Sequence, residues 1–134
     1  MIKVVFDTNV FISALFWKGK PKQVVELALS RKIVGVTSTK ILLELKKKLI
    51  EKFSYPLDQT EQYLQIIAKE CLMVSPFMKI NIVTEDSTDN KIVEAAVAGN
   101  TDYIVTGDNH LLKIGSYRGI QIVTPNKLIT ILKL

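Results

Sequence analysis

The chain of 134 residues is 48% hydrophobic and carries a formal net charge of +5, which fits one domain over residues 1–134 with a buried core. It lacks the run of about 18 apolar residues that a membrane helix needs, and residues 1–3 lead straight into an expected strand. We therefore expect a cytoplasmic protein with no membrane segment and no signal peptide. Cys71 is the only cysteine, which excludes an internal disulfide and, with a single histidine, a zinc site of soft ligands.

Strands and helices alternate along the first half of the chain. Residues 2–6 form a short apolar run that predicts a buried strand, and residues 9–15 predict a short helix. Pro21 suits the first turn of a second helix, which leads to another strand at residues 33–36. The hydroxyls of residues 37–39 favour the start of a helix, which apolar residues continue at helical spacing to residue 53, and residues 58–68 predict one more.

The second half continues the alternation. Residues 73–83 fit a short third strand, and Pro76 favours an edge position for it because proline cannot donate to a ladder. A helix follows from Asp89 to Gly99, and the last elements are strands at 103–105 and 120–123 and a helix from Pro125 to residue 132. Short connections between alternating elements predict an α/β fold, in which a parallel sheet is covered by helices on both faces.

Four acidic residues follow or open these elements, and the parallel topology would bring them to one edge of the sheet. Asp7 and Asp108 follow two of the expected strands, Asp89 opens a helix, and Glu44 lies in the second turn of the helix after residue 36. Ligands bind at the carboxyl edge of such sheets. Four carboxylates in one place repel each other unless a cation is present, and their hard oxygens suit Mg²⁺ or Mn²⁺.

Each acid also has a purely structural interpretation. Asp7 and Asp89 stand at N-cap positions, where a carboxylate accepts backbone hydrogen bonds and matches the helix dipole. Asp108 follows a glycine and fits a turn. Glu44 lies away from the centre of the apolar stripe of its helix, so a solvated side chain is its alternative. Asp86 competes with Asp89 as the ligand from their loop; the helical phase favours Asp89, and the choice stays open.

A basic surface around an acidic site suits a polyanion that is held by its phosphates and cut at a metal. Lys46, Lys47, Lys48 and Lys52 lie on or beside the polar face of the Glu44 helix and are candidate contacts for RNA phosphates. The alternative is that these lysines only solvate the helix. His110, just after Asp108, is a weaker candidate for a contact with the substrate, since the favoured interpretation is a histidine on a surface loop.

Four motifs in order resemble the PIN-domain ribonucleases, and by pattern the VapC-like toxins of prokaryotic toxin–antitoxin pairs. They are Asp7-Thr8-Asn9-Val10, Glu44 on a lysine-rich helix, residues 89–96, and Thr106-Gly107-Asp108. The resemblance implies a three-layer α/β/α sandwich whose parallel sheet has about five strands in the order 3-2-1-4-5. It also implies Mg²⁺- or Mn²⁺-dependent endoribonuclease activity, with RNA as the substrate.

The same resemblance implies roles for individual residues. Asp7, Glu44, Asp89 and Asp108 would be the catalytic, metal-binding acids. Thr106 would orient the first aspartate, and Asn9 would be a polar neighbour, with Asp86 as a further acid beside Asp89. A homodimer or higher homo-oligomer and a cognate antitoxin are the implied partners.

Two other functions fit parts of the sequence. The fold could be kept without cleavage, leaving an RNA- or protein-binding module whose acids only cap helices and hold a structural cation. A phosphotransferase of the haloacid-dehalogenase or receiver type also places an aspartate after a strand. The former type needs a second aspartate two residues later, where this chain has Asn9, and no lysine is suitably placed after a later strand.

Overall fold

A computed structural model describes residues 1–82 and 89–134 and contains a sheet in the order β3-β2-β1-β4-β6-β5. The strands are β1 (Lys3–Phe6), β2 (Val34–Ser38), β3 (Leu72–Val74), β4 (Tyr103–Val105), β5 (Ser116–Tyr117) and β6 (Ile120–Val123). The first five in spatial order are parallel, and only β5 pairs antiparallel, with β6. The expected parallel sheet and the order of its five main strands are therefore confirmed.

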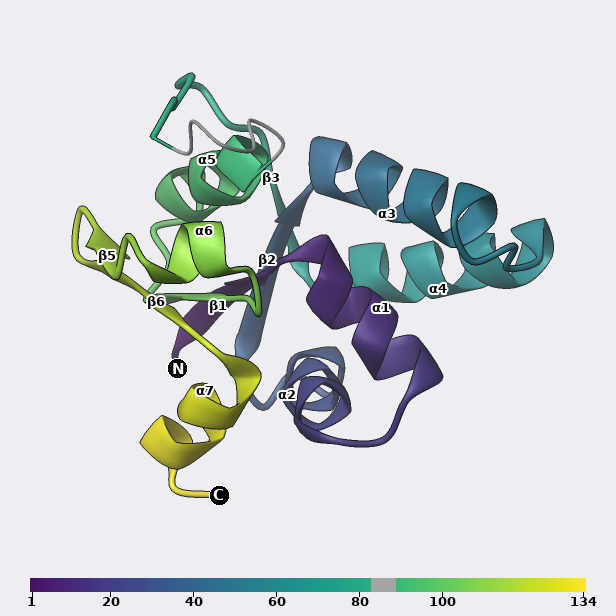
Figure 1. Ribbon diagram of the computed structural model, residues 1–134, viewed down its shortest axis with the longest axis horizontal. Coiled ribbons are helices and arrows are strands. Elements are labelled where there is room, and N and C mark those ends of the chain that lie inside the picture. The colour runs from purple at the N-terminus through teal and green to yellow at the C-terminus, as the bar shows by residue number, and fades with distance from the viewer. Residues whose placement is uncertain (83–88) are drawn as a thin grey trace.

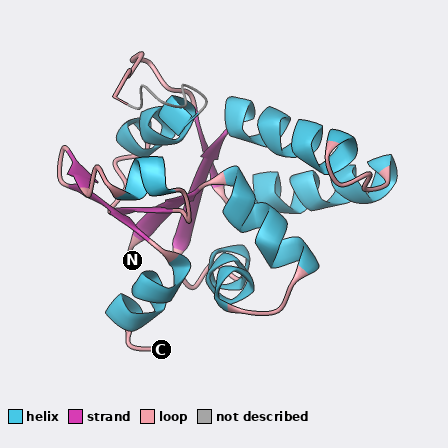
Figure 2. Cartoon of the chain, in the orientation of Figure 1, coloured by secondary structure: helices cyan, strands magenta, loops and turns pink. Residues whose placement is uncertain are grey.

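Helices flank this sheet, as Figure 1 and Figure 2 show. They are α1 (Thr8–Phe16), α2 (Lys20–Leu29), α3 (Thr39–Glu51), α4 (Leu57–Glu70), α5 (Asn90–Ala98), α6 (Asn109–Leu112) and α7 (Pro125–Leu132). The helices α5 and α6 lie on one side of the sheet and α1, α2 and α7 on the other, while α3 and α4 pack on each other. This division follows from right-handed crossovers, because the chain reverses its direction across the sheet after β3.

The core forms where the apolar central strands meet the helices. Val4, Val5 and Phe6 of β1 are fully buried, as are Ile104 and Val105 of β4. The strands in the middle of a parallel sheet are covered on both faces, which is why they are continuous apolar runs.

Two small residues of β2 have different roles: Gly35 permits close packing, and Ser38 caps the helix that follows. A Cβ placed on Gly35 would lie 2.7 Å from Cys71 Sγ and 3.1 Å from Ala28 Cβ, so a glycine is needed for helix α2 and the start of β3 to approach the strand. At the end of β2, the Ser38 hydroxyl accepts a hydrogen bond from the backbone N–H of Ile41 at 3.3 Å. The expected hydroxyl cap of α3 is therefore confirmed.

Three details differ from the sequence predictions. The third strand covers only Leu72–Val74, so Pro76 lies beyond its end. The expected edge position of this strand is confirmed. The short elements α6 and β5 were not predicted, because four and two residues are too few to show a period.

Within the described ranges, no helix is long and apolar enough to cross a membrane.

Candidate functional site

Asp7 is a buried carboxylate at the end of β1. It is 4% exposed and stands at the N-cap of α1, yet its side chain makes no capping hydrogen bond. Its Oδ2 instead accepts a hydrogen bond of 2.7 Å from Thr106 Oγ1. Burial raises the pKa of Asp7 above its ordinary value, and the hydrogen bond from Thr106 and the charge of Lys48 oppose that rise. A helix cap alone does not account for this aspartate.

Thr106 joins Asp7 to Asp108. Its buried hydroxyl donates to Asp7 and accepts a hydrogen bond of 3.0 Å from the backbone N–H of Asp108. Neighbouring parallel strands β1 and β4 pair Phe6 with Val105, which places the residues that follow them side by side. The sheet thus brings together two aspartates that are about a hundred residues apart in sequence.

Asp108 also belongs to a second group of potential ligands. One ligand atom each from Asp89, Asp108 and His110 lies within 4.8 Å of the others. A side-chain hydrogen bond with Asp89 is the main cause that holds the pKa of Asp108 below its ordinary value, so the two carboxyl groups interact directly. Asp108 caps α6 as well, because its Oδ1 accepts a hydrogen bond of 3.0 Å from the His110 N–H.

Glu44 lies between two lysines from different helices. Its Oε1 is 3.1 Å from Lys48 Nζ on the same helix, and its Oε2 is 2.8 Å from Lys91 Nζ on α5. All three side chains are largely buried, with exposed fractions of 15% for Glu44, 21% for Lys48 and 22% for Lys91. Glu44 is therefore not the solvated glutamate that helical periodicity alone would favour, because α5 packs against this part of α3.

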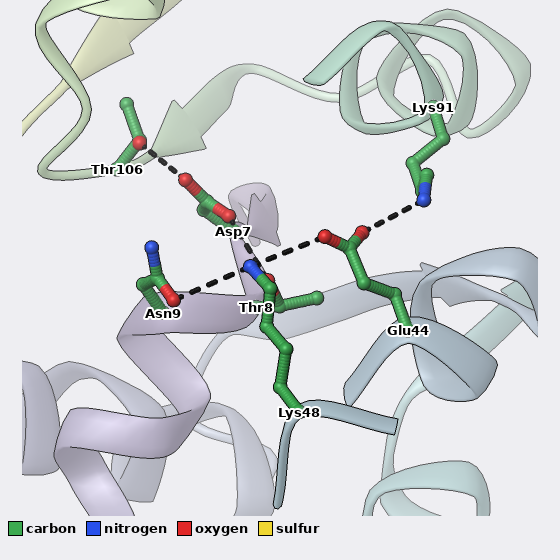
Figure 3. Close-up of polar contacts among 7 residues, drawn as sticks. All are labelled: Asp7, Thr8, Asn9, Glu44, Lys48, Lys91 and Thr106. Carbon is green, nitrogen blue, oxygen red and sulfur yellow. Dashed lines mark hydrogen bonds and ion pairs between the residues drawn. The ribbon is translucent and has the colours of Figure 1, made fainter. Parts of the chain in front are cut away.

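Lys48 connects Glu44 to the Asp7 side of the site (Figure 3). Its ammonium group donates to Thr8 Oγ1 at 3.0 Å and to Asn9 Oδ1 at 3.4 Å, and the Thr8 hydroxyl in turn donates to Asp7 Oδ1 at 3.4 Å. A continuous chain of polar contacts therefore runs from Glu44 through Lys48, Thr8, Asp7, Thr106 and Asp108 to Asp89.

The residues that the sequence proposed for the site fall into three groups: those in or beside the polar chain, those in the compact ligand group, and those in neither. The polar chain contains the four acids, with Thr106 and Asn9 in contact with it, whereas the compact ligand group, among the described residues, consists of Asp89, Asp108 and His110. Asp86 lies outside the described residues. Lys46 faces away from the acids and pairs with Glu61 of α4, 3.7 Å away.

Two participants were missed by sequence reasoning. Thr8 is fully buried and links Lys48 to Asp7, and Lys91 binds Glu44. Thr8 stands inside the Asp-Thr-Asn motif, so its position was a usable signal. Lys91 gave none, because its pairing with Glu44 depends on how α5 packs on α3.

The donor set suits a hard divalent cation. Asp89 and Asp108 each bring one carboxylate oxygen to within 4.8 Å of the other, and a cation held between them would compensate both charges. Carboxylate oxygens are the ligands that Mg²⁺ and Mn²⁺ prefer. Asp7 is close by, joined to Asp108 through Thr106, and its buried charge would also be compensated by a cation.

Comparisons with solved structures agree with this fold. VapBC2 from Rickettsia felis, crystallised bound to a DNA fragment from their promoter, matches with a TM-score of 0.63 at 18% identity, over 90% of this chain and 97% of that one. PAE2754 from Pyrobaculum aerophilum matches with a TM-score of 0.61 at 13% identity, over 100% of this chain and 91% of the other.

Comparisons of sequence identify the family. The uncharacterized protein MJ1680 of Methanocaldococcus jannaschii is 36% identical over 118 residues, which are 84% of this chain and 75% of that protein. The family model described as the PIN domain matches residues 3–110, which include all four acids of the polar chain. The chain belongs to the PIN domain family.

Proposed function

We propose that this protein is an endoribonuclease that requires Mg²⁺ or Mn²⁺ and cleaves RNA phosphodiester bonds. The observation that carries the proposal is the single polar chain that connects Asp7, Glu44, Asp89 and Asp108 at the carboxyl edge of the sheet. Membership of the PIN domain family supports it, as does the net charge of +5, which favours a polyanionic substrate.

Asp89 and Asp108 would hold the cation, with Asp7 and Glu44 completing the acidic set. A bound divalent cation supplies Lewis-acid activation and stabilises the charge that develops on the phosphate in the transition state. Thr106 holds Asp7 in position from one side and Thr8 from the other, so the carboxylate keeps its orientation while the substrate binds. His110 stands beside Asp108 at the mouth of the site, where its imidazole can meet a substrate phosphate.

We further propose that the protein is the toxin of a toxin–antitoxin pair and acts in the cytoplasm. The similarity of its fold to VapBC2 supports this assignment. A cognate antitoxin and a homodimer or higher homo-oligomer are the expected partners. An antitoxin that covers the carboxyl edge of the sheet would block access to the acids, which is a direct route to inhibition.

The cleavage experiment uses a mixed pool of labelled RNA with purified protein in Mn²⁺, in Mg²⁺ and in EDTA. We expect endonucleolytic fragments with either metal and none in EDTA. Asp7→Asn and Asp108→Asn should each lower the rate by at least about tenfold, because each removes a charge that faces the cation. Circular dichroism would show that both variants remain folded.

Asp58→Asn is the matched control, since Asp58 is an exposed acid in the first turn of α4 and is not a member of the polar chain. It should cleave like the wild type. Intact RNA with wild-type protein and both metals would overturn the nuclease proposal and leave an RNA- or protein-binding module. An unchanged rate in Asp7→Asn would remove Asp7 from the site.

A further inference from the structure

A lysine-lined groove lies along one side of α3 and includes Glu44 and Lys48 of the polar chain in its wall. It has a volume of about 460 Å³, and its walls include five lysines and two glutamates. The lysines are Lys40, Lys47, Lys48, Lys52 and Lys91. Residues 40 to 52 span roughly 18 Å at about 1.5 Å per residue, a length that on the order of five stacked nucleotides would cover.

The groove has the chemistry of a phosphate site rather than of a base-reading site. Lys40, Lys47 and Lys52 are exposed, and the surrounding wall offers ammonium groups at helical spacing. Among the described residues that line it, none is aromatic, so stacking of bases contributes nothing. Such a surface attracts a flexible polyanion by its backbone, with little preference for sequence.

The two innermost lysines differ from the outer three. Lys48 and Lys91 are both paired with Glu44, and Lys48 is also held by Thr8 and Asn9. Glu44 therefore fixes two ammonium groups where the groove meets the acidic site, and at the same time neutralises part of their charge. Removal of the Glu44 charge would release both lysines to bind phosphate.

We infer that the groove along α3 binds the phosphate backbone of single-stranded RNA and leads it to the acidic site, and that Glu44 masks its two innermost lysines. The inference deepens the proposed function and rests on it for the identity of the ligand. Charge complementarity favours RNA, and the continuity of the groove with Lys48 places the strand beside Asp7 and Glu44. The groove would thus supply affinity, and the acids would supply the chemistry.

The test measures binding of a fluorescent single-stranded RNA of about 12 nucleotides by anisotropy in EDTA, across a range of salt concentrations. The double variant Lys47→Gln/Lys52→Gln should bind about tenfold more weakly than wild type, and its salt dependence should be shallower by roughly 0.7 per lost phosphate contact. Glu44→Gln should bind severalfold more tightly, because it unmasks two lysines.

Lys46→Gln is the matched control, since Lys46 comes from the same helix but lines a neighbouring groove and pairs with Glu61. It should bind like the wild type. Equal loss in Lys46→Gln and in the double variant would overturn the inference, because it would show a diffuse charge effect. Weaker binding by Glu44→Gln would overturn the masking role.

Competition by polyglutamate identifies the class of ligand. Displacement of the RNA at the same concentration of charge would overturn the RNA assignment in favour of an acidic protein segment. Addition of Mn²⁺ to the same samples separates the two proposals. Lysine-dependent binding without cleavage would contradict the proposed nuclease alone, whereas cleavage with binding that ignores Lys47 and Lys52 would contradict the groove alone.

Discussion

Thr106 occupies a fully buried position between two acids and satisfies a polar group of each. Its hydroxyl donates to the Asp7 carboxylate and accepts from the Asp108 N–H. Valine has the same shape but neither function. Asp7 Oδ2 and the Asp108 N–H would then both lose their hydrogen bond to this hydroxyl, and such losses cost more than the hydrogen bonds themselves contribute.

We therefore predict that Thr106→Val lowers the free energy of unfolding by about 1–3 kcal/mol, measured by urea denaturation in EDTA. Thr106→Ser keeps the hydroxyl and should lose much less. A valine variant as stable as the serine variant would show that water replaces the hydroxyl at no cost.

Asp89 is expected to be the ligand from its loop, because its carboxyl group lies within 4.8 Å of that of Asp108 and is hydrogen-bonded to it. We predict that Asp89→Asn lowers the rate of RNA cleavage by at least about tenfold, and more than Asp86→Asn does. Cleavage rates of the two variants in Mn²⁺ would measure the difference. The reverse order would assign the role to Asp86.

At the scale of elements, the sequence predicted which segments are strands and helices, and the sheet order of the main strands followed from the family resemblance. The features that the sequence did not predict have physical explanations. The two-residue strand β5 folds back onto β6 through a turn at Arg118 and Gly119, whose φ angles of 50° and 81° are both positive. Helical periodicity alone would leave Glu44 solvated, because a periodic pattern describes one helix and says nothing of the second helix that covers it.

The contact between β2, α2 and the start of β3 leads to a prediction of its own. In Gly35→Ala the new methyl group would meet buried Cys71 Sγ, so we expect a loss of about 1–3 kcal/mol in the free energy of unfolding. The double variant Gly35→Ala/Cys71→Ala removes the clashing sulfur and should regain part of this stability relative to Gly35→Ala. Urea denaturation of the three proteins measures the coupling. An additive result would place the strain elsewhere.

For the whole molecule, the site couples stability to cation and proton binding. Because burial raises the pKa of Asp7 above 3.8, the folded protein takes up this proton at a higher pH than the unfolded chain does. Without metal, Asp7 thus favours the folded state at acid pH, and this contribution is lost as the pH rises through the raised pKa. A cation binds the ionised form of the Asp7 carboxyl group, so the affinity for the cation should rise as the pH rises through the raised pKa of Asp7.

We predict that saturating Mn²⁺ raises the melting temperature at pH 7.5, with about 2.7 kcal/mol of stabilisation at a hundred times the dissociation constant. The gain should shrink as the pH falls toward the raised pKa of Asp7, and that decline begins above pH 3.8. Asp108→Asn should lose most of the gain. A gain that is equal in Asp108→Asn and wild type would place the cation elsewhere.

Topology explains why distant residues could be assigned to one site from sequence. Once strands and helices alternate, right-handed connections place the carboxyl ends of the parallel strands on one edge of the sheet, and the structure shows that Asp7 and Asp108 follow adjacent strands there. The contact between Lys91 and Glu44 could not be assigned this way, because it depends on the separation and rotation of two helices rather than on the order of strands.

The two edge strands of the sheet have a consequence for assembly. One is the three-residue β3 and the other the two-residue β5, so each presents very few free backbone groups to an incoming chain. Short edge strands are poor templates for intermolecular strand addition, and this lowers the tendency of a protein to form fibrous aggregates. Any self-association of this molecule should therefore proceed through helical surfaces rather than through pairing of edge strands.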